Sequence, residues 1–271
     1  MKRTLTLTAT TAALALALTA CGSSNGGSSD DSAKSGESAS ALQKVKDSGV
    51  LTVGTEGTYR PFSFHEGSEL TGYDVDVIKA VGEKMGVEVK FQETQWDAIF
   101  AGLEAGRFDV IANEVAINPE REKKYLFSEP YSVSTGVIVT KSDNTDITSF
   151  EALKGKTTAQ SLTSNYYETA KDAGATVEPV EGWAQSVTLL KQGRVDATVN
   201  DKLTFLDAQK SNPDDSIKIA AEATEKTKSA VAMRKDATDL QKAIDDALEQ
   251  LRADGELAKI SEKYFGEDIS K

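Results

Sequence analysis

The chain has 271 residues, a formal net charge of −12 at pH 7, one cysteine and one histidine. An acidic surface of this kind disfavours binding to nucleic acid and to anionic lipid. A single cysteine excludes an internal disulfide and a cysteine metal cluster, and a single histidine argues against Ser–His catalysis. The sequence therefore predicts neither a metal site nor a cofactor site.

The first 20 residues predict a secretory signal and not a part of the fold. Lys2 and Arg3 form a positive n-region, and residues 5–18 are a run of Leu, Ala and Thr. This run is too short, and wrongly flanked, for a membrane-spanning helix. Small residues precede Cys21, as in a bacterial lipobox, so cleavage is expected to leave Cys21 as a lipid-carrying N-terminus. An ordinary signal peptide with a chance cysteine is the alternative.

The next segment predicts a flexible tether. Residues 21–40 are rich in Gly and Ser, and after Cys21 they carry no apolar residue larger than alanine. Such a segment cannot bury a core. The body that follows, residues 41–267, exceeds one typical domain and suits two lobes of about 100 residues each. No apolar stretch after residue 20 is long enough to span a bilayer.

The first part of the body alternates helical and extended patterns. Residues 75–85 place apolar side chains on one helical face and end before Gly86, a glycine suited to a helix C-terminus. Residues 87–91 then alternate apolar and polar residues, which is typical of a strand.

An internal repeat follows. Residues 96–114, WDAIFAGLEAGRFDVIANE, match residues 183–201, WAQSVTLLKQGRVDATVND, at an offset of 87 residues. Both copies read Trp, then Leu, then Gly-Arg-apolar-Asp, and both end in Asn followed by an acid. Each copy predicts a helix that ends at a left-handed glycine, Gly106 or Gly193, and then a strand.

The repeated strands are predicted at residues 108–112 and 195–199. Upstream of the second copy, residues 166–173 predict a helix closed by Gly174, and residues 177–180 predict a strand. Strands that alternate with helices imply a parallel sheet with helices on both faces. The sequence therefore predicts two similar α/β lobes.

Two acids mark the ends of the repeated strands. In open parallel sheets, ligands bind beyond the carboxyl ends of the strands. Glu114 and Asp201 occupy that position, so we expect both to face one cleft between the lobes. Either acid alone would be read as a solvated loop residue, and the matched pair favours the cleft.

Two extended, β-branched segments predict the connection between the lobes, at residues 136–140 and 229–233. They would form a two-stranded hinge. The predicted lobes are residues 41–139 with 232–271, and residues 140–231.

Two amphipathic patterns end the chain. Residues 237–253 predict a long helix with four apolar residues on one face, and residues 256–264 predict a shorter one. Both are expected to pack back on the first lobe.

The sequence resembles the extracellular solute-binding proteins of ABC importers that carry polar amino acids. The resemblance covers residues 48–266 and rests on GTEGTYRPFSF, LTGYDVDV, WDAIFAGLEAGRFDV, NPEREKKYLFSEPY and GRVDATVND, in the order and spacing of the family. The segments ANEVAINPEREKKY and SLTSN are most similar to the cystine-binding branch of this family. The resemblance implies a two-lobed periplasmic-binding-protein type II fold.

The resemblance also implies residue roles. Arg121 would hold the α-carboxylate of an amino acid, because a planar guanidinium offers paired donors to a carboxylate. Asp201 would accept the α-ammonium from the opposite lobe. Thr163 and Ser164 lie where a helix N-terminus favours anions, although Leu162 stands where relatives carry Gly.

Further contacts are implied around these residues. Aromatic side chains would form walls against the ligand, and polar groups would line the rest of the cleft. The ligand-binding residues that the sequence predicts are Glu56, Tyr59, Trp96, Asn113, Glu114, Ala116, Arg121, Thr163, Ser164 and Asp201. Trp183 repeats Trp96 and is an open candidate.

The function that this implies is capture of an amino acid, with L-cystine first, and delivery to an ABC permease. The protein would be a monomer anchored to the outer face of the cell membrane by lipid on Cys21. Other polar amino acids, such as glutamate, glutamine or a basic one, are the alternative ligands. An enzyme on the same scaffold, such as a dehydratase, is a weaker alternative, because paired carboxylates can act as acid and base. A sensory ectodomain would need a spanning helix and a cytoplasmic module.

Overall fold

The computed structural model describes residues 39–271, which form one compact unit. The predicted signal peptide, Cys21 and nearly all of the predicted tether lie outside these residues. Within the described part, no helix combines the length and apolar character needed to cross a membrane.

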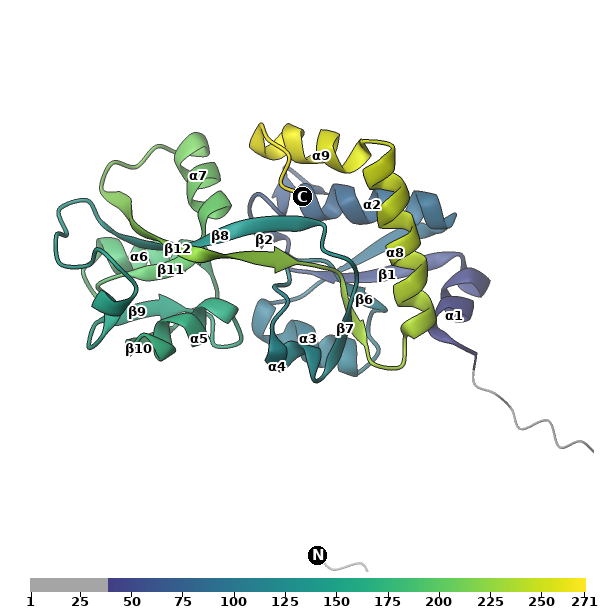
Figure 1. Ribbon diagram of the computed structural model, residues 1–271, viewed down its shortest axis with the longest axis horizontal. Coiled ribbons are helices and arrows are strands. Elements are labelled where there is room, and N and C mark those ends of the chain that lie inside the picture. Colours follow the sequence, from purple (N-terminus) through teal and green to yellow (C-terminus); the bar gives the residue numbers. More distant parts are fainter. Residues whose placement is uncertain (1–38) are drawn as a thin grey trace, which may run out of the picture. The chain divides into compact units, whose positions relative to one another are not determined.

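The body consists of two lobes (Figure 1). The larger lobe is built from both ends of the body, and the smaller one from its middle. The larger lobe contains α1 (Ala41–Ser48), β1 (Val50–Thr55), β2 (Thr58–Tyr59), β3 (Ser63–Glu66), β4 (Glu69–Thr71), α2 (Tyr73–Met85), β5 (Glu88–Glu93), α3 (Trp96–Glu104), β6 (Val110–Ile111), α4 (Pro119–Glu122), β7 (Tyr125–Phe127), β13 (Ala232–Arg234), α8 (Thr238–Ala253) and α9 (Glu256–Phe265).

The central sheet of the larger lobe has the strand order β5-β1-β6-β13-β7. Strands β5, β1 and β6 are parallel, as the helix–strand alternation predicts. The sheet as a whole is mixed, because β13 runs antiparallel to both β6 and β7. Since β13 returns from the smaller lobe, it enters the sheet from the opposite end. The expectation of a wholly parallel sheet was therefore wrong.

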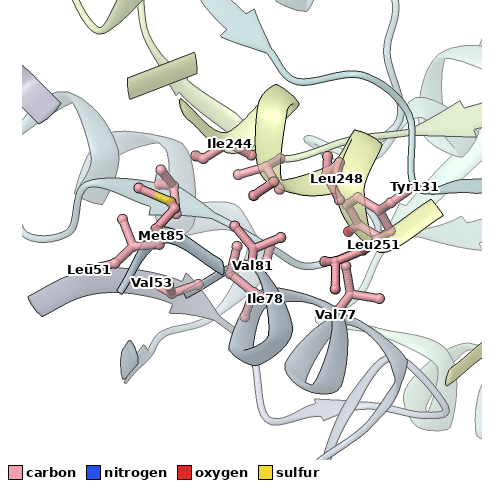
Figure 2. Close-up of a cluster of buried hydrophobic side chains, with 14 of the residues drawn as sticks. Leu51, Val53, Val77, Ile78, Val81, Met85, Tyr131, Ile244, Leu248 and Leu251 are labelled. Atoms are coloured by element: carbon pink, nitrogen blue, oxygen red, sulfur yellow. The ribbon is translucent and has the colours of Figure 1, made fainter. Parts of the chain in front are cut away.

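Helices cover both faces of this sheet. On one face, α2 and α8 bury a continuous apolar cluster; Figure 2 shows Val77, Ile78 and Val81 of α2 directed toward Ile244 and Leu248 of α8. Burying one such side chain stabilises the fold by roughly 1.5–3 kcal/mol. On the other face, α3 packs its own cluster against the sheet. The prediction that the C-terminal helices pack on the first lobe is confirmed.

The smaller lobe contains β8 (Ser132–Lys141), β9 (Thr157–Gln160), α5 (Asn165–Asp172), β10 (Thr176–Pro179), α6 (Trp183–Lys191), β11 (Thr198–Asp201), α7 (Lys202–Ser211) and β12 (Ile217–Ser229). Strands β9 and β10 are parallel, whereas β8 runs antiparallel to both β11 and β12.

The second repeated strand lies later in the chain than predicted. It was expected at residues 195–199 with Asn200 and Asp201 beyond its end, but β11 spans Thr198–Asp201. The reason is its pairing with β8, which extends to Asp201 opposite Gly136. Residue Ala197 makes only an isolated parallel bridge to Thr158 of β9. The first repeated strand is also shorter than residues 108–112, since β6 is only Val110–Ile111.

The repeat itself is visible in the structure. Helices α3 and α6 each begin at the repeated tryptophan and each have 9 residues. Gly106 and Gly193 follow them with the same left-handed φ of 68°. Glycine adopts this conformation at little cost, which explains why both helices stop there.

Two antiparallel strands, β8 and β12, join the lobes; the first contains the predicted segment 136–140, whereas the second ends at Ser229, where the predicted segment 229–233 begins. Strand β8 pairs with β12 from Lys141 to Ser132, with two register shifts on the way (Figure 1). The end of β12 lies opposite the beginning of β8, where Ser229 pairs with Ser132. Both connections therefore cross between the lobes side by side.

Candidate functional site

A pocket of about 80 Å³ lies between the lobes. We call it the acid pocket, because four acids line it: Glu56, Glu114, Glu181 and Asp201. It also takes residues from the hinge strand β12, so both lobes and the hinge form its walls. The predicted site residues found in its lining are Glu56, Tyr59, Trp96, Asn113, Glu114, Ala116, Ser164 and Asp201. Trp183, the open candidate, lines it as well.

The other two predicted residues, Arg121 and Thr163, line an adjoining hollow of about 1440 Å³, the arginine hollow. The two spaces share several walls, among them Ala116 and Ser164. The structure thus brings all ten predicted residues to one interlobe region, but in two spaces.

Asp201 lies at the junction of β11 and α7 in the smaller lobe. It is the N-cap of α7, and its Oδ1 accepts a hydrogen bond from the Leu203 backbone N–H at 2.8 Å. Its Oδ2 accepts from the Tyr166 hydroxyl at 3.0 Å and from the Ser134 hydroxyl. The residue is 1% exposed, and this burial raises the pKa of its carboxyl. Asp201 is therefore rigidly oriented and lacks a cationic partner within the described residues.

Glu114 lies on the larger lobe after β6. Among the described non-glycine residues it alone has a positive φ, 48°. Its backbone N–H donates to Asp74, and its Oε1 accepts from the Ser132 hydroxyl. Its Oε2 forms no hydrogen bond of ordinary geometry within the protein, and the Ser229 hydroxyl, which also lacks a partner, lies near enough to lower the pKa of the carboxyl. Burial, followed by the charges of Asp74 and Asp201, raises the pKa of Glu114.

Arg121 belongs to the short helix α4, which Asn118 caps by accepting the Arg121 backbone N–H at 2.8 Å. Its guanidinium donates to the Ala116 carbonyl at 2.8 Å and, across the lobes, to the Thr163 carbonyl at 3.0 Å. Burial lowers the pKa of Arg121 to about 10. A guanidinium has five N–H donors, so these two bonds leave three for a ligand.

Aromatic rings surround this guanidinium. Its Cζ lies 5.3 Å from the ring centre of Trp96 and 5.2 Å from that of Phe100, distances at which cation–π attraction acts. The indole Nε1 of Trp96 is buried and makes no hydrogen bond within the protein. Trp96 is therefore a wall of the acid pocket that also supports Arg121.

Asn113 orients the glutamate at the edge of the acid pocket. Its side-chain oxygen accepts from the Glu56 backbone N–H at 2.8 Å and from the Thr55 hydroxyl at 2.9 Å. Its amide nitrogen donates to Glu56 Oε2 at 2.7 Å. Burial raises the pKa of Glu56 to about 7, and the bond from Asn113 opposes part of that rise.

This raised pKa gives a testable effect on stability. An acid whose folded pKa lies above its unfolded value stabilises the fold at low pH and loses that contribution as pH rises. The glutamine of Glu56→Gln cannot ionise. Its free energy of unfolding should therefore rise relative to that of the wild type as the pH increases from 4.5 to about 7. We expect a gain of roughly 1–2 kcal/mol, allowing for partial exposure.

Urea denaturation of both proteins below and above this window measures the gain. Glu66→Gln, at an exposed position of β3, is the matched control and should show no such change. If the difference in free energy of unfolding between Glu56→Gln and the wild type is the same below and above this window, the pKa of Glu56 is not raised by burial.

Direct bonds hold the lobes together across the site. The Thr163 hydroxyl donates to Asp97 at 2.6 Å, and the Arg60 Nε pairs with Asp207 at 3.1 Å. The lobes are therefore closed on each other.

Several important residues were not among those predicted from the sequence. Asp74, in the first turn of α2, fixes the Glu114 backbone, and Ser132 and Ser134 bind the two acids. Tyr166 binds Asp201. Two features of the sequence could have indicated them: Asp74 lies in the family landmark LTGYDVDV, and Ser132 and Ser134 alternate along the segment SVSTG.

Comparison with known proteins places the chain in a family. Residues 51–267 match the model of bacterial extracellular solute-binding proteins, family 3. The L-cystine-binding protein TcyA of Bacillus subtilis is 50% identical over 257 residues, covering 94% of each chain.

Two solved structures show how the lobes compare. The L-cystine solute receptor of Neisseria gonorrhoeae, in its unliganded open conformation, is 49% identical, with a TM-score of 0.59, 86% of this chain covered and 100% of the receptor. An ancestral arginine-binding protein bound to arginine is 38% identical and has a TM-score of 0.75, with 80% of this chain covered and 99% of that protein. The more identical structure is thus the less similar in shape, as expected when one structure is open and this chain is closed. The chain belongs to the bacterial extracellular solute-binding proteins, family 3.

Proposed function

We propose that this protein is the substrate-binding protein of an amino-acid ABC importer, and that it captures L-cystine between its lobes and delivers it to the permease. The cystine-binding relatives support the choice of ligand. The protein binds its ligand without converting it. The lipid on Cys21 holds it at the outer face of the cell membrane as a monomer.

The observation that carries this proposal is the set of buried polar groups that lack partners within the protein. The acid pocket holds four such groups: Oε2 of Glu114, the donors Trp96 Nε1 and Gln160 Nε2, and the Ser229 hydroxyl. Buried polar atoms nearly always have hydrogen-bond partners, and each one left without a partner costs about 1–3 kcal/mol. A zwitterionic ligand brings both acceptors and donors and would satisfy groups of both kinds.

Closure of the lobes provides the mechanism. A ligand shifts an open–closed equilibrium only if it binds the closed form better. Arg121 lies on the larger lobe and Asp201 on the smaller one, so a single amino acid that contacts both requires closure. The guanidinium keeps three donors free for the α-carboxylate, and Asp201 accepts the α-ammonium.

A basic amino acid is the second candidate. Four acids line the acid pocket, whereas Arg121 lines the adjoining hollow. This excess of acidic groups suits a ligand with a further cation as well as it suits the second ammonium of cystine. Arginine is the obvious probe, because structural relatives bind it.

A thermal-shift panel of the 20 common amino acids with L-cystine tests the proposal. We expect the largest rise in melting temperature with L-cystine, followed by calorimetry that gives a single site. A ligand present at about 100 times its Kd stabilises by roughly 2.7 kcal/mol, which the shift resolves easily. A largest shift with arginine favours the second candidate. No shift with any amino acid contradicts the proposed function.

A further inference from the structure

Glu114 is held in a conformation that its own sequence does not favour. A residue with a side chain at positive φ is strained by about 1–3 kcal/mol and persists only when its surroundings impose it. Here Asp74 accepts the Glu114 backbone N–H, and the Ser132 hydroxyl binds Oε1. These contacts direct a carboxyl that is 8% exposed into the acid pocket, with Oε2 unpaired within the protein.

The hinge strand places the carboxyls of Glu114 and Asp201 next to each other. Glu114 binds Ser132, and Asp201 binds Ser134, two residues further along β8. Residues i and i+2 of a strand point to the same face and lie about 6–7 Å apart. Two carboxyls, one from each lobe, are thus anchored side by side on one wall. An ammonium group has three donors and can bind both.

The groups around Glu114 provide no positive charge. The ionisable groups that face it come from α2, β11, the segment before β8, β2 and α5; they are Asp74, Tyr73, Asp201, Tyr131, Tyr59 and Tyr166. No lysine, arginine or histidine in residues 39–271 forms a hydrogen bond or ion pair with Asp74, Glu114 or Asp201. In this closed form, burial and the neighbouring acids raise the pKa of Glu114, which favours a protonated carboxyl until a ligand cation reaches it.

We propose that Glu114 is a second acceptor for the ligand α-ammonium, and that it takes this role by releasing its proton to solvent as the ligand binds. This inference rests on the proposed function. Before binding, the site holds a carboxylic acid at Glu114 and the ligand carries its ammonium. Afterwards a carboxylate faces that ammonium and one proton is in the solvent. The α-ammonium is then bound by Asp201 from one lobe and by Glu114 from the other, which adds a second link that only the closed form makes.

Proton release on binding is the direct test. Calorimetric titration with L-cystine, or with whichever amino acid binds best in the panel, is run near neutral pH in two buffers of different ionisation enthalpy. We expect the wild type to release close to one proton per ligand and Glu114→Gln close to none. Affinity of the wild type should fall on acidification by up to about tenfold per pH unit, and that of Glu114→Gln should not.

Controls separate this inference from the proposed function. Glu69→Gln, at an exposed position of β4, should behave as the wild type. Unchanged release in Glu114→Gln overturns the inference and points to another acid, such as Glu56. Binding without release by the wild type overturns only the inference, whereas no binding of any amino acid overturns the proposed function. If Glu114→Gln does not fold, infrared difference spectra of the wild type decide: loss of a protonated carboxyl band on ligand addition supports the inference, and no loss refutes it.

Discussion

Arg121→Ala should weaken L-cystine binding by roughly thirtyfold to several thousandfold. Removing one partner of a buried charge pair typically costs about 2–5 kcal/mol, because the other charge stays buried. Here the variant loses the proposed donors for the α-carboxylate and also the bond to the Thr163 carbonyl, 3.0 Å away on the other lobe. Isothermal titration calorimetry measures the loss.

The matched control for Arg121 is Lys124→Ala, on the same segment but exposed. It removes a positive charge that lines neither the acid pocket nor the arginine hollow, so this variant should bind L-cystine with the affinity of the wild type. An Arg121→Ala protein that binds with near wild-type affinity contradicts the carboxylate clamp. Equal losses in both variants would instead indicate a long-range effect of net charge.

Asp201→Asn should weaken binding by about 10- to 150-fold while leaving the fold intact. A charge-assisted hydrogen bond to the α-ammonium is worth roughly 1.5–3 kcal/mol, and the amide removes the charge. Asparagine caps helices as well as aspartate does, so the bond from the Leu203 N–H to the cap of α7 can be kept. Burial raises the pKa of Asp201, so loss of the charge itself should not lower stability near neutral pH, and the Tyr166 and Ser134 hydroxyls can turn to accept from the new amide.

Circular dichroism and thermal melts accompany this titration. Asp215→Asn, exposed on the same lobe, is the control and should change neither affinity nor melting temperature. If Asp201→Asn loses its secondary structure, Asp201 is primarily a structural residue and the ammonium assignment is lost. Retained fold with unchanged affinity also excludes it.

Local patterns were enough to predict the helices and the two-lobed fold. Helices α3 and α6 follow from the repeated tryptophan and from Gly106 and Gly193, because capping and amphipathicity depend on residues close in sequence. Helices α2, α8 and α9 follow for the same reason. The interlobe region that collects the predicted residues could be anticipated from the matched acids, Glu114 and Asp201.

Contacts between distant segments could not be predicted from these patterns. The register of β11 depends on its pairing with β8, about 60 residues earlier, and not on its own apolar pattern. The strained backbone of Glu114 depends on Asp74, 40 residues away. Likewise, no local signal shows that Arg121 donates to the carbonyls of Ala116 and Thr163.

The central claim is that one amino acid is held by Arg121 from the larger lobe and by Asp201 from the smaller one. A crystal structure of the protein with L-cystine tests it most directly. We predict an α-carboxylate within hydrogen-bond distance of the Arg121 guanidinium and an α-ammonium within that distance of the Asp201 carboxylate, with the lobes closed. A ligand that contacts one lobe only, or that lies outside the acid pocket and the arginine hollow, would contradict it.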